Sequence, residues 1–120
     1  MNVGIIVDKI INIPEKFYKQ GDVSIYSLLK ETGYFELYDQ INVEDIYSAL
    51  KNKRDEIHNW LQWSEDKRSN SGWYFTANET GEYIVGYFPV KEGIATERYT
   101  DVFLACAHFI KKEIEVIRSS

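Results

Sequence analysis

The stretch from residue 71 to residue 89 reads SGWYFTANETGEYIVGYFP, and it decides the fold class of this chain. Its two runs, residues 71–76 and 82–89, are rich in aromatic and β-branched side chains, which suit a pleated, half-buried strand. The intervening Asn-Glu-Thr-Gly at 78–81 is typical of a hairpin turn, because Gly81 can adopt a left-handed conformation. The stretch therefore predicts an antiparallel β-hairpin.

The sheet built on this hairpin should be small. We expect its strands to include residues 73–76 and 82–88. A Lys-Glu-Gly turn at 91–93 precedes residues 94–99, which could add one more strand. The sequence therefore predicts an antiparallel sheet of two or three strands.

After the sheet, the apolar spacing becomes helical and continues to the end of the chain. Thr100 is a good N-cap for this last helix. Its apolar arc consists of Val102, Phe103, Cys106, Phe109, Ile110, Ile114, Val116 and Ile117. Glu113 lies within the arc, so we expect it either to pair with Arg98 or to lie at the edge of the arc. The helix should pack across one face of the sheet.

Helical patterns also precede the sheet. Residues 3–11 should form a helix with Ile5, Ile6, Ile10 and Ile13 near one stripe, and Pro14 ends or restarts it. A second helix contains Ile25, Leu28 and Leu29. Asp22 or Ser24 can cap it, and Gly33 is placed to close it.

Two further helices follow a short helical or turn-like segment at 34–40. Asn42 can cap the first, over residues 43–51, and the second should run from about residue 53 to residue 67. The apolar arc of the second helix consists of Ile57, Trp60, Leu61, Trp63 and Ser64. Its opposite side carries Asp55, Asn59, Gln62 and Asp66. Together with Glu44 and Asp45 on the preceding helix, these residues suggest an acidic surface made by two adjacent helices.

These patterns predict a single α+β domain spanning residues 1–120. N-terminal helices precede a small antiparallel sheet, and the C-terminal helix packs on that sheet. A chain of 120 residues has the usual size of one domain, which leaves no room for a second.

The negative charge of the chain is concentrated in one segment. The net charge is −5, and residues 31–66 contain nine acidic and three basic residues, a local charge of −6. Such a segment repels phosphate backbones and anionic lipid, so we expect no direct nucleic-acid or membrane binding. A basic protein partner fits this charge better, although the acidic surface could equally serve solubility.

The residues available for catalysis are few. Cys106 lies within an apolar arc, and His108 points away from it on the same helix, so we expect no catalytic dyad there. His58 should be a surface residue. The two histidines and the cysteine lack zinc-ligand spacing, and the glycines form no phosphate-binding loop. We therefore expect no metal, no cofactor and no enzymatic activity.

The cysteine content and the first residues indicate the compartment. One cysteine cannot form an internal disulfide, which favours a reducing environment. The initial MNVGIIVDKIINIP has no basic residue before its apolar run, so we interpret it as a cytoplasmic start.

Four strings of the sequence resemble those of a known class of proteins. They are Trp63-Ser-Glu-Asp-Lys-Arg68, Ser71-Gly-Trp-Tyr-Phe75, Tyr83-Ile-Val-Gly-Tyr-Phe-Pro89 and Ala105-Cys-Ala-His-Phe-Ile110. Together they resemble small acidic immunity proteins encoded beside secreted bacterial toxins, including those of contact-dependent inhibition systems. The resemblance covers about the second half of the chain and implies a cytoplasmic inhibitor of a toxin domain. Many such toxins are nucleases with basic clefts. The resemblance assigns no role to any individual residue.

Charge and periodicity alone select the candidate site. The predicted partner-binding residues are Asp39, Glu44, Asp45, Asp55, Asn59, Gln62 and Asp66, with Tyr34, Tyr38, Trp63 and Trp73 as aromatic candidates at its edge. The alternatives to an immunity protein are a non-catalytic regulatory or adaptor domain that binds a host protein, and an unrecognised hydrolase. The oligomeric state stays open.

Overall fold

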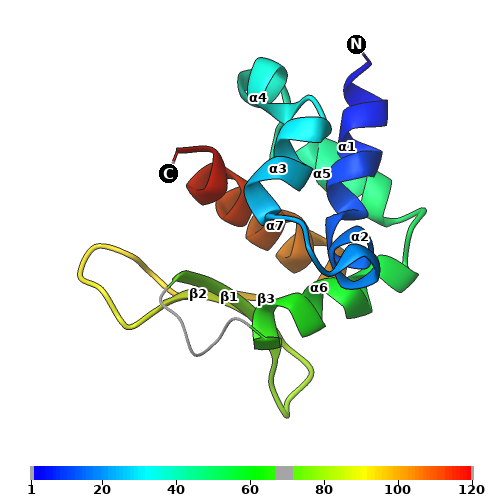
Figure 1. Ribbon diagram of the computed structural model, residues 1–120. Coiled ribbons are helices and arrows are strands. Elements are labelled where there is room, and N and C mark those ends of the chain that lie inside the picture. Colours follow the sequence, from blue (N-terminus) through cyan, green and yellow to red (C-terminus); the bar gives the residue numbers. More distant parts are fainter. Residues whose placement is uncertain (1, 67–71, 120) are drawn as a thin grey trace.

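The C-terminal helix α7 (Val102–Ser119) runs through the middle of the molecule, as Figure 1 shows. The computed structural model describes residues 2–66 and 72–119. Within these ranges, an antiparallel sheet packs against one side of α7 and N-terminal helices pack against the other. The fold is therefore α+β with the C-terminal helix on the sheet, as the sequence predicts.

Short helices make up the N-terminal part of the chain. They are α1 (Val3–Ile11), α2 (Ile13–Gln20), α3 (Ile25–Glu31), α4 (Tyr34–Leu37), the 3-10 helix η1 (Tyr38–Gln40), α5 (Val43–Leu50) and α6 (Asp55–Asp66). Lys67, where the last of these was predicted to end, and Ser71, at the start of the predicted hairpin, lie outside the described residues.

Pro14 restarts the chain as α2 and does not end the helical region. It lies in the first turn of α2, where its missing N–H leaves no helical hydrogen bond unmade. The buried side of α1 consists of Ile6, Val7, Ile10 and Ile11. The prediction that Ile5 belongs to this stripe was wrong: Ile5 is 51% exposed, because the stripe is centred one residue further along the helix.

The structure decides the caps that the sequence predicted for three helices. The Ser24 hydroxyl accepts a hydrogen bond from the Ser27 N–H at 3.0 Å, which selects Ser24 rather than Asp22 as the cap of α3. Asn42 caps α5 as predicted. At α7, Asp101 rather than Thr100 supplies the cap, since its carboxylate accepts from the Phe103 N–H at 3.0 Å.

The sheet has three strands in the order β1 (Gly72–Ala77), β2 (Tyr83–Phe88) and β3 (Glu97–Tyr99). Phe75 lies opposite Val85 in the register, and both are buried on the face that α7 covers. On the other face, Tyr74 lies across Gly86: a Cβ placed on that glycine would come within 2.6 Å of the Tyr74 hydroxyl. Gly86 thus provides the space for an aromatic side chain of the neighbouring strand.

The tryptophans of α6 join the two sides of the core. Trp60 donates from Nε1 to the Ile11 carbonyl at 3.0 Å, which ties α6 to the end of α1. Trp63 donates from Nε1 to the buried Glu113 carboxylate, also at 3.0 Å. Glu113 is therefore buried and not at the edge of the arc, and Arg98, the other predicted partner, lies 3.7 Å from Glu82 at the surface.

Candidate functional site

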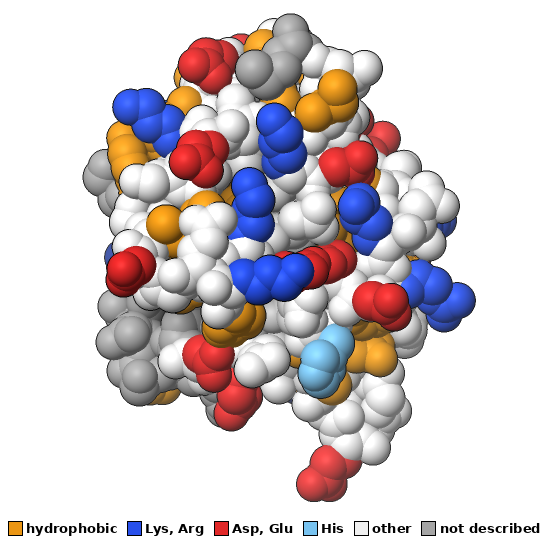
Figure 2. All heavy atoms as spheres, turned by 45° about the vertical axis from the view of Figure 1, so that its right-hand side comes forward, with side chains coloured by type: hydrophobic (Ala, Val, Ile, Leu, Met, Phe, Trp, Pro, Cys, Tyr) orange, Lys and Arg blue, Asp and Glu red, His pale blue; other side chains and the backbone are white. Residues whose placement is uncertain are grey.

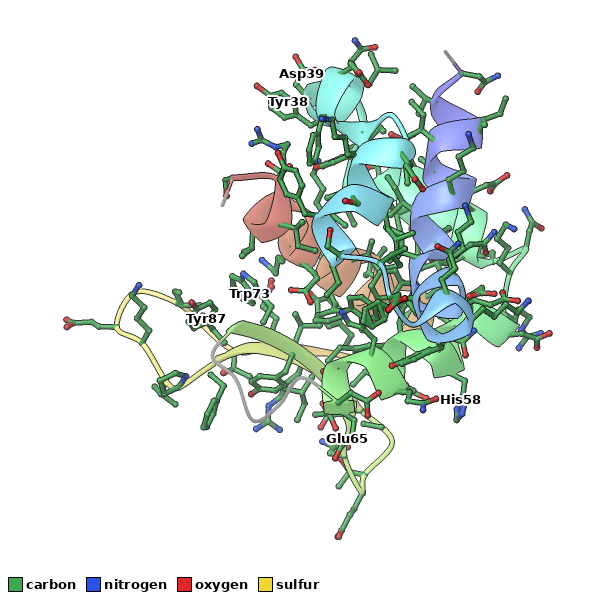
Figure 3. All side chains as sticks on the ribbon, viewed as in Figure 1. Tyr38, Asp39, His58, Glu65, Trp73 and Tyr87 are labelled. Carbon is green, nitrogen blue, oxygen red and sulfur yellow. The ribbon has the colours of Figure 1, made fainter. Side chains whose placement is uncertain are left out.

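The structure distributes the predicted acidic residues over separate regions. Asp39 lies on η1, and Figure 3 places it at the opposite end of the molecule from Glu65, which belongs to α6. Helix α5 packs mainly on α1 and α7, whereas α6 packs on α2, β1 and α7. Apart from α7, which both helices contact, α5 and α6 therefore pack on different neighbours. Sequence periodicity gives the faces of each helix but not which helices are neighbours.

Three of the seven predicted binding residues also have structural partners. Asp45 completes a capping box, in which its carboxylate accepts from the Asn42 N–H at 3.0 Å. Asp66 accepts from the Tyr18 hydroxyl of α2 at 2.7 Å. Asn59 donates to Glu56 at 3.1 Å on its own helix. The remaining four, Asp39, Glu44, Asp55 and Gln62, are exposed.

The aromatic residues predicted at the edge of the site divide into two groups. Tyr34 is fully buried and Trp63 is 5% exposed, so both belong to the core. Tyr38 is 39% exposed and Trp73 is partly exposed. Only these last two have side-chain surface that a partner could contact.

Acidic and basic side chains are interspersed over much of the surface. Figure 2 shows the mixture on the face where the side of α1 and α2 comes forward. An excess of negative or positive charge is therefore expected in individual hollows and not across a whole face.

A groove between α1 and α5 has an excess of negative charge. Its volume is about 470 Å³. It is lined by Asn2, Val3, Gly4, Ile5, Val7, Asp8, Asp45, Ser48, Ala49 and Asn52. Two of these residues are acidic and none is lysine or arginine, so the groove presents two carboxylates and several neutral polar groups.

Local sequence choices on both helices create this groove. Gly4 and Ala49 are small, which leaves space between α1 and α5 where larger side chains would fill it. The Asn2 side chain accepts from the Gly4 N–H at 2.7 Å and thereby begins α1. The capping box of α5 holds Asp45 on the other wall.

Sequence reasoning selected one carboxylate of this groove and missed the other. Asp45 was among the predicted residues, whereas Asp8 was not, because it lies outside the acidic segment. No local signal marked Asp8, because the sequence predicted Ile5 to belong to the apolar stripe and a Cβ on Gly4 would meet its own cap Asn2 rather than α5. Which helix would face Asp8 could not be read from the sequence.

A second polar cluster joins the end of α7 to the α4–η1 segment. The Lys111 ammonium donates to the Tyr34 hydroxyl at 2.8 Å and to the carbonyls of Tyr38 and Ile41 at 3.1 and 2.6 Å. The Tyr34 hydroxyl donates in turn to Glu115, whose carboxylate also accepts from Arg118 at 2.9 and 3.1 Å.

The electrostatics of this cluster follow from its contacts. The hydrogen bond from Arg118 holds the pKa of Glu115 below its usual value, and burial lowers the pKa of Lys111. Burial, together with the bond to Glu115, raises the pKa of the Tyr34 hydroxyl. A neutral tyrosine and a paired carboxylate fit a structural clamp.

The cysteine and the two histidines do not line the α1–α5 groove. Cys106 is fully buried, and burial raises the pKa of its thiol well above the usual value. His108 stacks on Tyr99, and burial lowers its pKa. His58 is exposed on α6 (Figure 3).

One pair of neighbouring carboxyls bridges α2 and α6. A hydrogen bond from Lys19, at 3.1 Å, lowers the pKa of Glu15, whereas burial raises the pKa of the adjacent Glu56. Neither carboxyl lines the α1–α5 groove. The pair is therefore separate from that groove.

Within residues 2–66 and 72–119, no group of three or more His, Cys, Asp or Glu side chains is arranged to hold a metal ion. The same residues include no helix with the length and apolar character needed to cross a membrane.

Comparisons with known proteins give no relatives for this chain. No family model matches it, and no curated protein or solved structure matches it either. The assignment of function therefore depends on the residues and their geometry.

Proposed function

We propose that this chain is a non-catalytic inhibitor of the immunity-protein kind, which binds a basic cleft of a bacterial toxin domain in the cytoplasm. The observation that carries the proposal is the α1–α5 groove, whose lining includes Asp8 and Asp45 and no lysine or arginine. The resemblance to immunity proteins supplies the class of partner.

The groove suits a lysine or arginine side chain from a partner. Asp8 and Asp45 can each accept charge-assisted hydrogen bonds, and Ser48 and Asn52 add neutral polar groups. Ile5 is 51% exposed in the lining, so the stem of the incoming side chain would find an apolar contact. Polar and apolar contacts at one place are what an interface anchor needs.

The acidic residues outside the groove would act at longer range. Residues 31–66 carry a local charge of −6, and Asp39, Glu44 and Asp55 are exposed. Exposed carboxylates of this kind steer a basic partner toward the protein and raise the association rate, and salt weakens the effect. They contribute less to the lifetime of the complex than carboxylates that the partner desolvates.

The α6 residues Asp55 and Asp66 are less suitable for testing partner binding. Reversing Asp55 and Asp66 together would break the hydrogen bond between Asp66 and Tyr18, which is 2.7 Å long. A loss of binding in that variant could come from altered packing of α2. The groove offers a cleaner pair.

The test compares two double variants in a pull-down and a titration with the product of the neighbouring upstream reading frame. The groove variant, Asp8→Asn with Asp45→Asn, keeps a side-chain acceptor for the Asn42 N–H and removes two charges. The control, Glu79→Gln with Glu92→Gln, removes the same charge at exposed positions outside the groove. Desolvated charge pairs cost about 2–5 kcal/mol on truncation, so the groove variant should bind at least roughly 30-fold more weakly.

Three outcomes decide the proposal. Weakened binding in the groove variant alone, with unchanged far-ultraviolet circular dichroism, supports it. Equally weakened binding in both variants would show that the groove residues act only through the net charge of the protein. Absence of any binding to the neighbouring gene product would contradict the toxin partner and favour an adaptor domain for a host protein.

A further inference from the structure

A second hollow lies between the C-terminal half of α7 and the start of β1. Its volume is about 360 Å³, and its lining includes Trp73, Lys111, Lys112, Glu115, Val116 and Arg118. Three of these residues are cationic and one is acidic, in a chain whose net charge is −5. The hollow is thus opposite in sign to the α1–α5 groove.

Trp73 forms an ordered aromatic wall of this hollow. Its ring and that of Tyr87, its register partner on β2, meet edge to face at 5.3 Å between centroids. Figure 3 shows the two side chains together beside the end of α7. The Lys112 ammonium lies 4.6 Å from the centre of the Trp73 ring. These contacts hold the indole in one orientation, which lowers the entropy cost of using it as an anchor.

The cations of the hollow differ in how far contacts within the protein already engage them. Lys111 already donates to Tyr34, Tyr38 and Ile41, so it serves the α4–η1 clamp. Lys112 lies 3.5 Å from Glu97 and over the Trp73 ring, and its side chain is 30% exposed.

Arg118 contributes a second accessible cation. It pairs with Glu115, its guanidinium stacks 3.8 Å from the centre of the Tyr38 ring, and its side chain is 27% exposed. Lys112 and Arg118 are therefore the two cations that an incoming anion could reach.

An apolar surface accompanies these charges. Val116 is 44% exposed in the lining of the hollow, between Lys112 and Arg118 along α7. A ligand with both a carboxylate and an aliphatic or aromatic side chain would use the cations and this wall together. We propose that the α7–β1 hollow is a second protein-binding site, which takes an acidic peptide segment carrying an apolar residue.

The local geometry favours a peptide over a single-stranded nucleic acid. Lys112 covers the Trp73 ring and Tyr87 contacts it edge to face, so the indole does not present an open platform for base stacking. A peptide segment can also add an apolar side chain that contacts the exposed Val116.

The experiment measures fluorescence anisotropy of a labelled peptide with the sequence Glu-Glu-Leu-Glu repeated twice. The hollow variant is Lys112→Gln with Arg118→Gln. The control, Lys16→Gln with Lys30→Gln, makes the same charge change at exposed positions of α2 and α3. The parent and the control should bind the peptide, and the hollow variant should bind at least tenfold more weakly.

A second variant tests the hollow without breaking the Arg118–Glu115 ion pair, because the loss of that pair could itself impair folding. Val116→Asp places a carboxylate at an exposed position of the hollow and leaves that pair in place. It should also reduce peptide binding at least tenfold, with the circular dichroism of the parent. Unchanged binding in both variants, or no binding of the peptide by the parent at millimolar concentration, would overturn the proposal. Tighter binding of an eight-nucleotide thymidine oligomer than of the peptide would overturn it too, in favour of a nucleic-acid site.

Discussion

Glu113 and Cys106 are two residues of α7 whose surroundings explain why they are buried. Glu113 is 3% exposed and accepts a hydrogen bond from the Trp63 indole, which offsets part of the cost of burying a carboxylate. Cys106 is fully buried. The first residue orders a contact between two helices, and the second fills volume.

Replacing Cys106 with alanine should lower stability without changing binding. The substitution removes one buried sulfur atom and leaves a small cavity, so the free energy of unfolding should fall by roughly 1–2 kcal/mol. Urea unfolding followed by tryptophan fluorescence measures this change. Weaker binding by a folded Cys106→Ala variant would contradict the purely structural role of the thiol.

Helix α7 depends on its first turn as well as on its apolar arc. Asp101 accepts from the N–H groups of Phe103 and Leu104 at 3.0 and 3.4 Å, and from the Tyr47 hydroxyl at 2.7 Å. One carboxylate thereby caps α7 and connects it to α5. The hydrogen bond from Tyr47 holds the pKa of Asp101 below its ordinary value of 3.8.

This lowered pKa predicts a specific loss of stability in acid. The unfolded chain binds a proton at Asp101 more readily than the folded chain does, so the contribution is complete above about pH 5 and is lost as the pH falls through the folded pKa. In Tyr47→Phe the Asp101 pKa should rise toward 3.8. The variant should therefore lose less stability than the parent between about pH 5 and about pH 3.

Urea unfolding at a series of pH values tests this prediction. Asp45→Asn serves as a control, because it changes a different helix cap and leaves the Tyr47–Asp101 bond in place. Parallel pH curves for Tyr47→Phe and the parent would show that the Tyr47 bond does not set the pKa of Asp101.

At the scale of the whole molecule, the two hollows lie on separate parts of the fold. The acidic groove lies between α1 and α5, and the basic hollow lies between the end of α7 and β1. Figure 1 shows α1 and the C-terminal end of α7 on different sides of the helical layer. The two hollows therefore differ in the sign of their charged residues, although acidic and basic side chains are mixed on the face in Figure 2.

This separation predicts that the two sites act independently. Asp8→Asn with Asp45→Asn should leave binding of the acidic peptide within about twofold of the parent, and the hollow variant should leave toxin binding equally unchanged. Substitutions at distant sites without shared partners add within about 0.5 kcal/mol. Titration of all four combinations measures the coupling. A coupling energy above about 1 kcal/mol would show that the two sites communicate through α7 or α5.

Much of the fold was determined by local sequence patterns. The change from helical spacing to aromatic, β-branched runs at residues 71–89 predicted the hairpin, and the structure confirms it in β1 and β2. The roles of Asn42 as a helix cap and of Gly81 as a turn residue could be predicted from the sequence. A cap or a left-handed turn requires particular residue types at one position.

The site depended on contacts that no local pattern contains. Periodicity located the acidic faces of α5 and α6 but could not show that α5 would pack on α1 and α6 on α2. Asp8 and Asp45 lie far apart in the chain, and they line one groove only because Gly4 and Ala49 leave space between their helices. Spacing within a helix is fixed by backbone geometry, so the sequence alone determined which residues share a face. Which faces meet depends on how side chains from distant segments fill a common core, and only the tertiary structure decided that.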